Sequence, residues 1–237
     1  MRILFDLHTH TIASGHAFST LKENIEEAKA KSLYAMGTSD HSISMPGTTH
    51  PIFFSNYKTI KDSIMGVRIL KSIEVNIIAL DGTIDMDNSA LENMDYVIAS
   101  LHQPCVTAGT AEQNTYAVIQ AMKNPYVKII GHPDDDRFPL NYDKLVSAAK
   151  TEQAALELNN SSFSERSGRI NAHKNCTKML RLCKKHSVPI VMSSDAHIYY
   201  DVGNMSSCEK LLDELDFPKE LVLNYSMEGL AFILKKV

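Results

Sequence analysis

The sequence has no tryptophan, and its four cysteines form no Cys-x-x-Cys pair. Cysteines this few and dispersed do not make the disulfide framework of a small secreted protein. No apolar run approaches the length of about 20 residues that a membrane-spanning helix needs. Basic residues are also not in excess, with 24 lysines and arginines against 28 aspartates and glutamates and a net charge of −4. This balance argues against an extended nucleic-acid-binding surface.

The N-terminal segment lacks the long apolar core of a secretory signal, because Asp6 follows only three apolar residues, Ile3 to Phe5. We therefore expect a cytoplasmic protein with no membrane partner. The chain of 237 residues, 44% hydrophobic and 22% charged, has the composition of an ordinary globular protein. Its length fits one α/β barrel or two smaller domains.

Short continuous apolar runs of the kind found in strands covered on both faces recur along the chain. The predicted strands are residues 3–7, 34–38, 67–73, 96–101, 127–130, 154–158 and 190–193. The segments between them have helical patterns, and the predicted helices are residues 20–31, 57–65, 115–123, 142–152, 171–186 and 207–215. A weaker strand-like segment, 221–223, precedes a last helix from about Ser226.

This alternation favours a parallel sheet, and no linker rich in proline, glycine or serine interrupts it. We predict one domain over residues 1–237, built as a closed or nearly closed α/β barrel of seven strands. An open doubly wound sheet is the alternative. It would bring side chains from its outer strands together poorly, whereas a closed barrel gathers them at one mouth.

Polar residues follow the predicted strands at nearly regular intervals. The series His8, His41, Glu74, His102, His132, Asn159 and Asp195 has spacings of 27 to 36 residues. A strand, a crossover helix and the next strand need about 30 residues, so each member lies at the carboxyl end of its strand, where catalytic groups of parallel barrels gather. His10 shares a face with His8, and a buried Glu74 would be costly unless paired or metal-bound. The pattern predicts a metal site.

The motifs at these positions resemble those of the PHP (polymerase and histidinol phosphatase) domain family, in particular its small bacterial phosphatases. The resemblance covers nearly the whole chain through Asp-Leu-His-Thr-His-Thr, Ser-Asp-His, Ile-Glu-Val-Asn, Ser-Leu-His, Gly-His-Pro, Leu-Glu-Leu-Asn-Asn and Ser-Ser-Asp-Ala-His. Each of the nine positions at which that family binds metal carries the expected residue type. Two departures, Gln103 and the acidic run from Asp134 to Asp136, bear on leaving-group preference.

The resemblance implies a distorted, TIM-like (β/α)7 barrel that holds three divalent metal ions. The implied ligands are His8, His10, Glu74 and Asp195 for the first ion, Glu74, His102 and His132 for the second, and His16, His41 and His197 for the third. Imidazole and carboxylate ligands without thiolate suit zinc, manganese or iron. Zinc is the ion that we expect, with manganese and iron as the alternatives.

The implied activity is hydrolysis of a small phosphate monoester. Three divalent ions and two carboxylates leave a charge of +4 to attract the substrate, and a metal-bound hydroxide would attack phosphorus. Glu74 and Asp195 are predicted to act in catalysis together with Asp40, which either orients a ligand or caps its own loop. A homo-oligomer is compatible with the sequence.

The predicted substrate contacts follow the sixth strand. They are Asn159, Arg166 and Arg169. Asparagine also favours turns, which is the alternative for Asn159. The two arginines either bind phosphate oxygens or are solvated in a loop. His50, in the long loop between residues 42 and 55, is a candidate contact from a lid.

Three other functions fit parts of the pattern. The same metal chemistry would serve a nuclease that acts on the ends of short nucleic acids. A metal-dependent amidohydrolase also begins with His-x-His, but it holds two metals and has no counterpart to His16, His41 and His197. A nonenzymatic PHP-like module is the third alternative. Metal stoichiometry and a substrate screen distinguish these functions.

Overall fold

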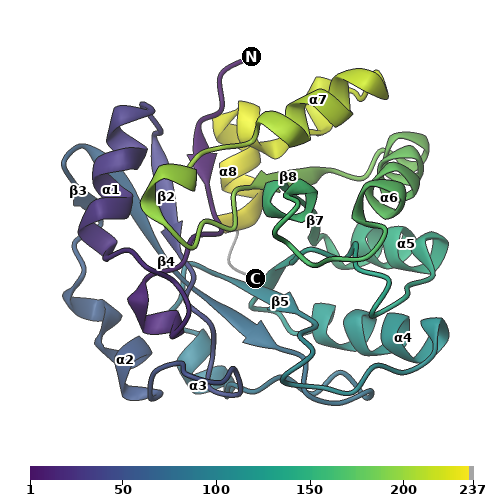
Figure 1. Ribbon diagram of the computed structural model, residues 1–237, viewed down its shortest axis with the longest axis horizontal. Coiled ribbons are helices and arrows are strands. Elements are labelled where there is room, and N and C mark those ends of the chain that lie inside the picture. Colours follow the sequence, from purple (N-terminus) through teal and green to yellow (C-terminus); the bar gives the residue numbers. More distant parts are fainter. Residues whose placement is uncertain (235–237) are drawn as a thin grey trace.

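The computed structural model describes residues 1–234, in which strands and helices alternate around a parallel barrel (Figure 1). Seven strands of this part of the chain are parallel and follow one another in sequence order around the barrel: β1 (Phe5–Asp6), β2 (Ala35–Thr38), β4 (Val67–Asn76), β5 (Tyr96–Ser100), β6 (Val127–Ile130), β7 (Ala155–Asn159) and β8 (Ile190–Ser193). The predicted fold class and all seven predicted strands are confirmed.

The helices cover the outside of the barrel. The longer ones are α1 (Leu21–Ala30), α4 (Ala111–Met122), α5 (Tyr142–Glu152), α6 (Ala172–His186), α7 (Ser206–Glu214) and α8 (Met227–Leu234), and the short ones are α2 (Ile52–Ser55) and α3 (Asn88–Leu91). The 3₁₀ turns are η1 (Ile12–Ser14), η2 (Asn56–Thr59), η3 (Asn160–Phe163), η4 (Tyr199–Asp201), η5 (Lys219–Leu221) and η6 (Leu223–Tyr225). Thr20 and Glu23 form the capping box at the start of α1, as their spacing indicates.

Inward-facing positions change from apolar to polar along each strand. Alternate residues of a strand face the same side, and the small inner core includes Leu70, Tyr96 and Ala155. Glu74 lies four residues after Leu70 on the same face of β4, and Glu157 lies two residues after Ala155 on the same face of β7. Apolar side chains therefore fill the amino end of the barrel, and buried polar side chains occupy its carboxyl end.

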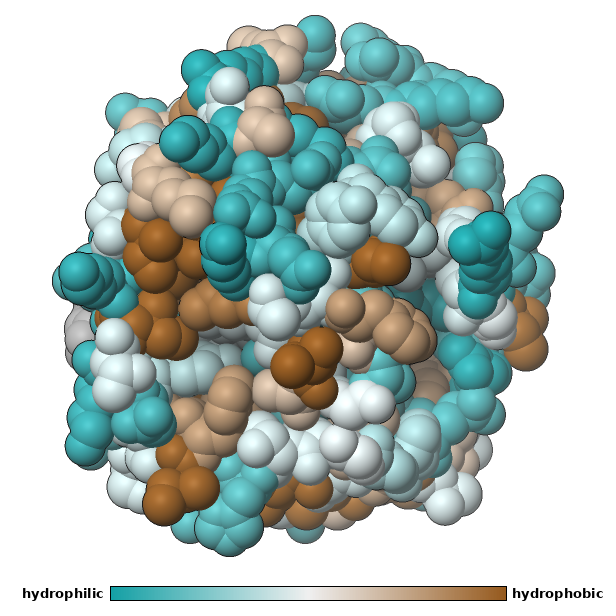
Figure 2. Space-filling model, turned by 60° about the vertical axis from the view of Figure 1, so that its left-hand side comes forward, coloured by the Kyte–Doolittle hydropathy of each residue, from teal (hydrophilic) through white to brown (hydrophobic). Residues whose placement is uncertain are grey.

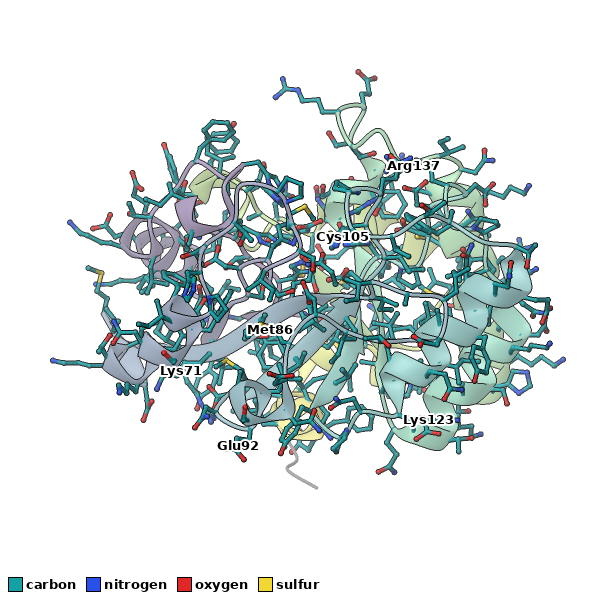
Figure 3. All side chains as sticks on the ribbon, turned by 90° about the horizontal axis from the view of Figure 1, so that it is seen from below. Lys71, Met86, Glu92, Cys105, Lys123 and Arg137 are labelled. Atoms are coloured by element: carbon teal, nitrogen blue, oxygen red, sulfur yellow. The ribbon has the colours of Figure 1, made fainter. Side chains whose placement is uncertain are left out.

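Labelled side chains in Figure 3 show these two ends of the barrel. Cys105 and Arg137, which belong to loops that follow β5 and β6, lie on one side of the molecule. Glu92 and Lys123, which precede the same two strands, lie on the other side. Loops that follow the strands thus gather on one face, as in other parallel barrels.

The barrel closes between β8 and β1 through a side chain. Asn224 donates from Nδ2 to the carbonyl oxygens of Phe5 and Met192, both at 2.9 Å, and its Oδ1 accepts from the backbone N–H of Met192 at 2.7 Å. An isolated parallel bridge between Thr9 and Ala196 extends the contact. The side chain of Asn224, which is fully buried, thus supplies hydrogen bonds where β8 and β1, the two ends of the sheet, meet.

Two local predictions are wrong. Residues 57–65 do not form a helix but a 3₁₀ turn followed by β3 (Ser63–Ile64), which pairs antiparallel with β4. Met65 and Gly66 both have positive φ, 55° and 85°, which is the backbone of a two-residue hairpin turn. Residues 221–223 do not form a strand either: Leu221 and Leu223 belong to two 3₁₀ turns, and Val222 between them makes one bridge to Ile190.

The surface is mixed in character. The face in Figure 2 shows hydrophobic side chains in several separate places among hydrophilic ones. Exposed large hydrophobic side chains include Ile12, Phe18, Ile43 and Ile52, and such scattered exposure is ordinary for a folded protein. Within residues 1–234, every helix is too short or too polar to cross a membrane.

Replacing Asn224 by alanine tests the closure of the barrel. The variant leaves three buried backbone groups of Phe5 and Met192 without their partner, and we expect a loss of about 3 kcal/mol in the free energy of unfolding. Urea unfolding at matched metal content measures the loss. Asn93→Ala, at an exposed asparagine, is the control and should change stability by less than about 0.5 kcal/mol. Equal stability of the two variants would contradict this role of Asn224.

Candidate metal centre

The nine side chains predicted as metal ligands lie together at the carboxyl end of the barrel. Glu74, near the end of β4, is at their centre and is completely buried. Nitrogen atoms of five imidazoles lie within 3.5 Å of its carboxylate oxygens: His8, His10, His41, His102 and His132. Residues from five strand ends, separated by up to 124 positions in the sequence, thus share one carboxylate.

Glu74 Oε2 and Asp195 Oδ1 face the same pair of imidazoles. His8 Nε2 is 3.3 Å from Glu74 Oε2 and 3.6 Å from Asp195 Oδ1. His10 Nε2 is 3.5 Å from Glu74 Oε2 and 3.2 Å from Asp195 Oδ1. Each of these two nitrogens thus lies within 3.6 Å of both oxygens, and His8, His10 and Glu74 offer ligand atoms that all lie within 4.8 Å of one another. Imidazole nitrogens and carboxylate oxygens that converge in this way could share one ion.

The other oxygen of Glu74 belongs to a second group. Oε1 lies 3.0 Å from His132 Nε2 and 3.4 Å from His102 Nε2, and it accepts a hydrogen bond from Ser100 Oγ at 2.6 Å. A Cβ atom on Gly131 would approach Ser100 Oγ to 2.2 Å. Glycine at this position therefore leaves room for the serine that holds the carboxylate.

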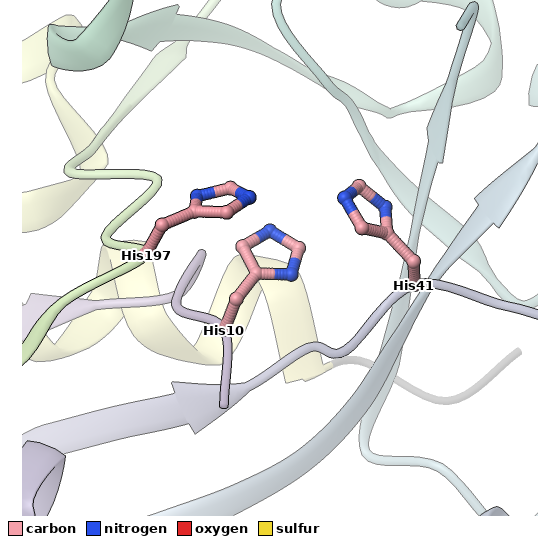
Figure 4. A group of neighbouring side chains, drawn as sticks. All are labelled: His10, His41 and His197. Carbon is pink, nitrogen blue, oxygen red and sulfur yellow. The ribbon is translucent and has the colours of Figure 1, made fainter. Parts of the chain in front are cut away.

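A third group consists of His16, His41 and His197. The Nε2 atoms of His16 and His197 are 3.1 Å apart, and the ring centroid of His41 is 4.9 Å from that of His16. Figure 4 shows the rings of His10, His41 and His197 turned toward a common space. One nitrogen of each of these three lies within 4.8 Å of the others, a spacing that a shared metal ion could span.

Unpaired atoms in the centre fit metal binding. His8 Nε2, His10 Nε2 and Glu74 Oε2 are buried and make no hydrogen bond, although they point at one another. Buried polar atoms are almost always hydrogen-bonded, so their convergence indicates a missing shared partner. Imidazole nitrogen and carboxylate oxygen are ligands of zinc, manganese and iron, which therefore fit these residues.

The second nitrogen of several rings is held from outside the centre. His8 Nδ1 contacts Glu157 Oε1 at 2.7 Å, and His102 Nδ1 contacts Asn76 Oδ1 at 2.7 Å. His197 Nδ1 contacts the carbonyl oxygen of Asp195 at 3.0 Å. Such contacts fix the orientation and tautomer of a metal-binding imidazole.

Asp40 acts on His10 through Ser14. Ser14 Oγ donates to Asp40 Oδ1 at 2.6 Å and lies 3.0 Å from His10 Nδ1. The second Asp40 oxygen accepts from Thr11 Oγ1 at 2.8 Å. Asp40 is fully buried, and within residues 1–234 its carboxylate contacts Ser14 and Thr11 and none of the inner ring nitrogens. A part of Asp40 in catalysis stays a prediction.

Glu157 is the residue that the sequence analysis missed. It is completely buried on β7, contacts His8 through Oε1, and accepts from the backbone N–H of His132 at 2.6 Å and from Asn159 Nδ2 at 3.0 Å through Oε2. The sequence does contain a signal for Glu157, because it is a carboxylate inside an apolar strand, Leu156-Glu157-Leu158. As for Glu74, burial of such a carboxylate is costly unless it is paired or bound to metal.

Burial and neighbouring charges set the ionisation of the centre. Burial alone raises the pKa of Glu74, but the imidazoles of His8, His41 and His102 outweigh it and hold that pKa well below its usual range. Burial and the imidazole of His197 lower the pKa of His10 well below its usual value, and burial lowers that of His16 to about 4. Burial lowers the pKa of His8, but the carboxylates of Glu157 and Glu74 outweigh it and raise that pKa well above its usual value. An imidazole binds metal in its neutral form, so metal binding at His8 would release a proton.

Two of the nine side chains are carried on left-handed backbone. His132 and Asp195 have φ values of 28° and 53°, which residues other than glycine rarely adopt. Each lies just after a strand, where the chain turns sharply. The Glu157 carboxylate receives the backbone N–H of His132 and so stabilises one of these turns. Strain of this kind is common at functional sites.

The predicted substrate residues lie at different depths. Asn159 is fully buried and donates to Asp195 Oδ2 at 3.1 Å. Arg169 pairs with the same oxygen at 3.0 Å and has a largely buried side chain. Arg166 is exposed in the loop after η3, and His50 is exposed in the loop before α2. Whether any of these four contacts substrate stays a prediction.

Comparison with known proteins identifies the family of this chain. The model of the PHP domain matches residues 6–161. A probable phosphatase of Clostridium novyi is 43% identical over 235 residues, which are 99% of this chain and 96% of that protein. A probable phosphatase of Acetivibrio thermocellus is 44% identical over 236 residues, which are 100% of this chain and 97% of that protein.

A solved structure with the same barrel is that of histidinol phosphate phosphatase from Lactococcus lactis, complexed with zinc, L-histidinol and phosphate. The TM-score is 0.64 over 91% of this chain and 95% of that chain, at 15% sequence identity. At this identity the likeness shows the fold, and it confirms the barrel.

Replacing Glu157 by glutamine tests its role as an orienting group. Glutamine keeps the size but loses the charge that holds His8 Nδ1, so we expect metal affinity to fall by about 10- to 100-fold. Competition with a chelator of known affinity measures the change. Glu152→Gln, at the exposed end of α5, is the matched control and should bind metal as the wild type does. Unchanged affinity in Glu157→Gln would refute the assigned role.

Proposed function

This chain belongs to the PHP domain family, and we propose that it is a phosphatase that hydrolyses small phosphate monoesters at a centre of three divalent metal ions. The observation that carries the proposal is the cluster of nine side chains, Glu74 and eight others, that offer nitrogen and oxygen atoms at the carboxyl end of the barrel. The names of the two relatives, which match it over nearly their whole length, support the same activity.

The ligand sets follow the three groups of side chains. His8, His10, Glu74 and Asp195 would hold one ion, and Glu74 would link it to a second ion at His102 and His132. His16, His41 and His197 would hold the third. Zinc is the expected ion, and manganese and iron are alternatives, because all three accept these ligands. Bound ions of this kind supply hydroxide at neutral pH and offset the negative charge of a phosphate.

The protein's own groups position the reaction. Glu74 presents both oxygens inward, and Ser100 fixes one of them. Asp40 and Glu157 hold the rings of His10, through Ser14, and of His8. These contacts keep the inner nitrogens in place without rearrangement, and such preorganisation lowers the barrier of a reaction that develops charge.

Arginine is the side chain suited to receive the phosphate. Arg169 is held by Asp195 Oδ2 and Ser162 Oγ, so its guanidinium is already oriented at the centre. Arg166 extends from the same loop. A guanidinium can donate two hydrogen bonds to phosphate oxygens, and we assign this contact to Arg169, whereas Arg166 would contact the rest of the substrate. We propose a small phosphorylated substrate in the cytoplasm, and a homo-oligomer is compatible with this function.

Metal content and metal removal test the proposal. We expect three ions per chain by elemental analysis of protein purified without added metal. Chelation should abolish hydrolysis of p-nitrophenyl phosphate, and zinc or manganese should restore it. Activity that survives complete removal of metal would contradict the proposal. Two ions per chain together with amide hydrolysis would instead indicate an amidohydrolase.

Replacing Glu74 by glutamine tests the central carboxylate. The variant loses a charge that two ions would share, and we expect kcat/KM to fall by about a thousandfold or more. The control is Glu92→Gln, at an exposed residue on the opposite side of the barrel (Figure 3). Near-normal turnover of Glu74→Gln with full metal content would rule the scheme out. Assays with short oligonucleotides in parallel distinguish a nuclease.

A further inference from the structure

A pocket of about 410 Å³ opens directly beside the metal centre. Ser194, Asp195 and His197 form the wall next to the centre, and the remaining walls come from η3, the loop that follows η3, and residues 200–207. Its volume is within the range of about 300–1,000 Å³ that is usual for small-molecule sites. Because the pocket adjoins the centre at Asp195 and His197, the ester group of a phosphate held at the centre would be directed into this pocket or into solvent.

We infer that this pocket binds the leaving group of the substrate and that it selects an uncharged, polyhydroxylated leaving group, as in the phosphate ester of a sugar or polyol. The inference rests on the proposed function and specifies its substrate class.

Several polar groups in the pocket have no partner within residues 1–234. Asn160 uses only its Oδ1, which accepts from the backbone N–H groups of Ser207 and Cys208 at 2.9 and 3.3 Å. Asn204 likewise uses only its Oδ1, which accepts from the N–H and hydroxyl of Ser206 at 3.4 and 3.0 Å. The amide nitrogens of both asparagines remain as donors at the pocket wall.

The remaining free groups add acceptors to these donors. The hydroxyls of Ser161, Ser207 and Tyr200 and the carboxylate of Asp201 line the pocket and make no side-chain hydrogen bond in the described chain. A hydroxyl both donates and accepts, so a wall that offers both kinds of group is satisfied best by a ligand with several hydroxyls. A hydrocarbon leaving group would leave these polar groups unpaired.

The charges of the pocket point to an uncharged ligand. Apart from the metal-centre residues Asp195 and His197, one cation and one anion line it, Arg166 and Asp201. Their opposite signs favour neither a second acidic group nor an amine on the leaving group. The rings of Phe163 and Tyr200 add apolar faces against which the carbon–hydrogen side of a sugar can pack.

The reaction requires no additional reactant. Water supplies the oxygen of the new bond to phosphorus, and the ester bond between phosphorus and the leaving oxygen breaks. The leaving oxygen takes up a proton, which gives the free polyol and inorganic phosphate.

A matched series of esters tests the pocket with the metal-loaded enzyme. The series is sorbitol 6-phosphate, n-hexyl phosphate and 6-aminohexyl phosphate, which share a six-carbon chain, with p-nitrophenyl phosphate as the general substrate. We expect kcat/KM for the sorbitol ester to exceed that for the hexyl ester by about 100-fold, as two hydrogen bonds of about tenfold each would give. The aminohexyl ester should resemble the hexyl ester.

Variants locate this preference in the pocket. Tyr200→Phe removes one hydroxyl, and Asn204→Leu removes one amide, so each should lower the ratio of kcat/KM between the sorbitol and hexyl esters by about tenfold. The controls are Tyr116→Phe, whose tyrosine is 55% exposed against 52% for Tyr200, and Asn93→Leu. Neither control should change the ratio. Asn204→Leu also removes the hydrogen bonds that Asn204 Oδ1 accepts from Ser206 at the start of α7. Tyr200→Phe removes neither of these bonds, so it tests the pocket even if Asn204→Leu disturbs the helix.

The outcomes separate the two proposals. Hydrolysis of p-nitrophenyl phosphate with similar kcat/KM for the sorbitol and hexyl esters, or with preference for the aminohexyl ester, overturns the pocket assignment alone. A preference for the sorbitol ester that persists in both pocket variants overturns it as well. Failure of the metal-loaded enzyme to hydrolyse any of the four esters overturns the proposed function itself.

Discussion

The structure depends on a carboxylate that has no access to water. Glu74 is completely buried, and burial of an unpaired carboxylate costs several kcal/mol. Five imidazoles from four other strand ends offset this cost by surrounding both oxygens. The arrangement fixes where β1, β2, β5 and β6 end relative to β4. Removal of Glu74 would therefore change the geometry of the whole mouth of the barrel as well as one ligand.

The barrel supports this cluster by dividing its interior into two zones. Apolar inward positions fill the amino end, where α8 contributes Leu230 and Ile233 to the same core. Polar inward positions fill the carboxyl end, and hydrogen bonds accepted by oxygens of Glu157, Asn76 and Asp40 orient the inner rings or the groups that hold them. Because these outer groups are themselves buried and bonded, the inner atoms have little freedom to rearrange. A rigid centre of this kind leaves specificity to the adjoining pocket.

The sequence predicted the elements whose signals are local or periodic. Apolar runs located all seven strands of the barrel, and the spacing of polar residues after them located six of the nine inner side chains. His10 followed from its alternation with His8, and His16 and His197 followed from the resemblance to the PHP family. Prediction failed where a contact between distant residues decides the conformation. Residues 57–65 look helical in composition, but a turn at Met65 and Gly66 pairs β3 with β4. Asn224, which completes the barrel, is one polar residue in an apolar C-terminal segment and carries no sequence pattern.

The sequence by itself determined the fold class, the order of the strands and the residue types of the centre, because strand–helix periodicity and chain direction place each strand end at the same mouth. Only the tertiary structure decided which atoms meet. It assigned the two oxygens of Glu74 to different groups of imidazoles, placed Asp40 behind Ser14, and revealed Glu157 and the pocket beside Asp195. These relations depend on distances between residues far apart in the chain, and those distances are set by how the closed barrel packs.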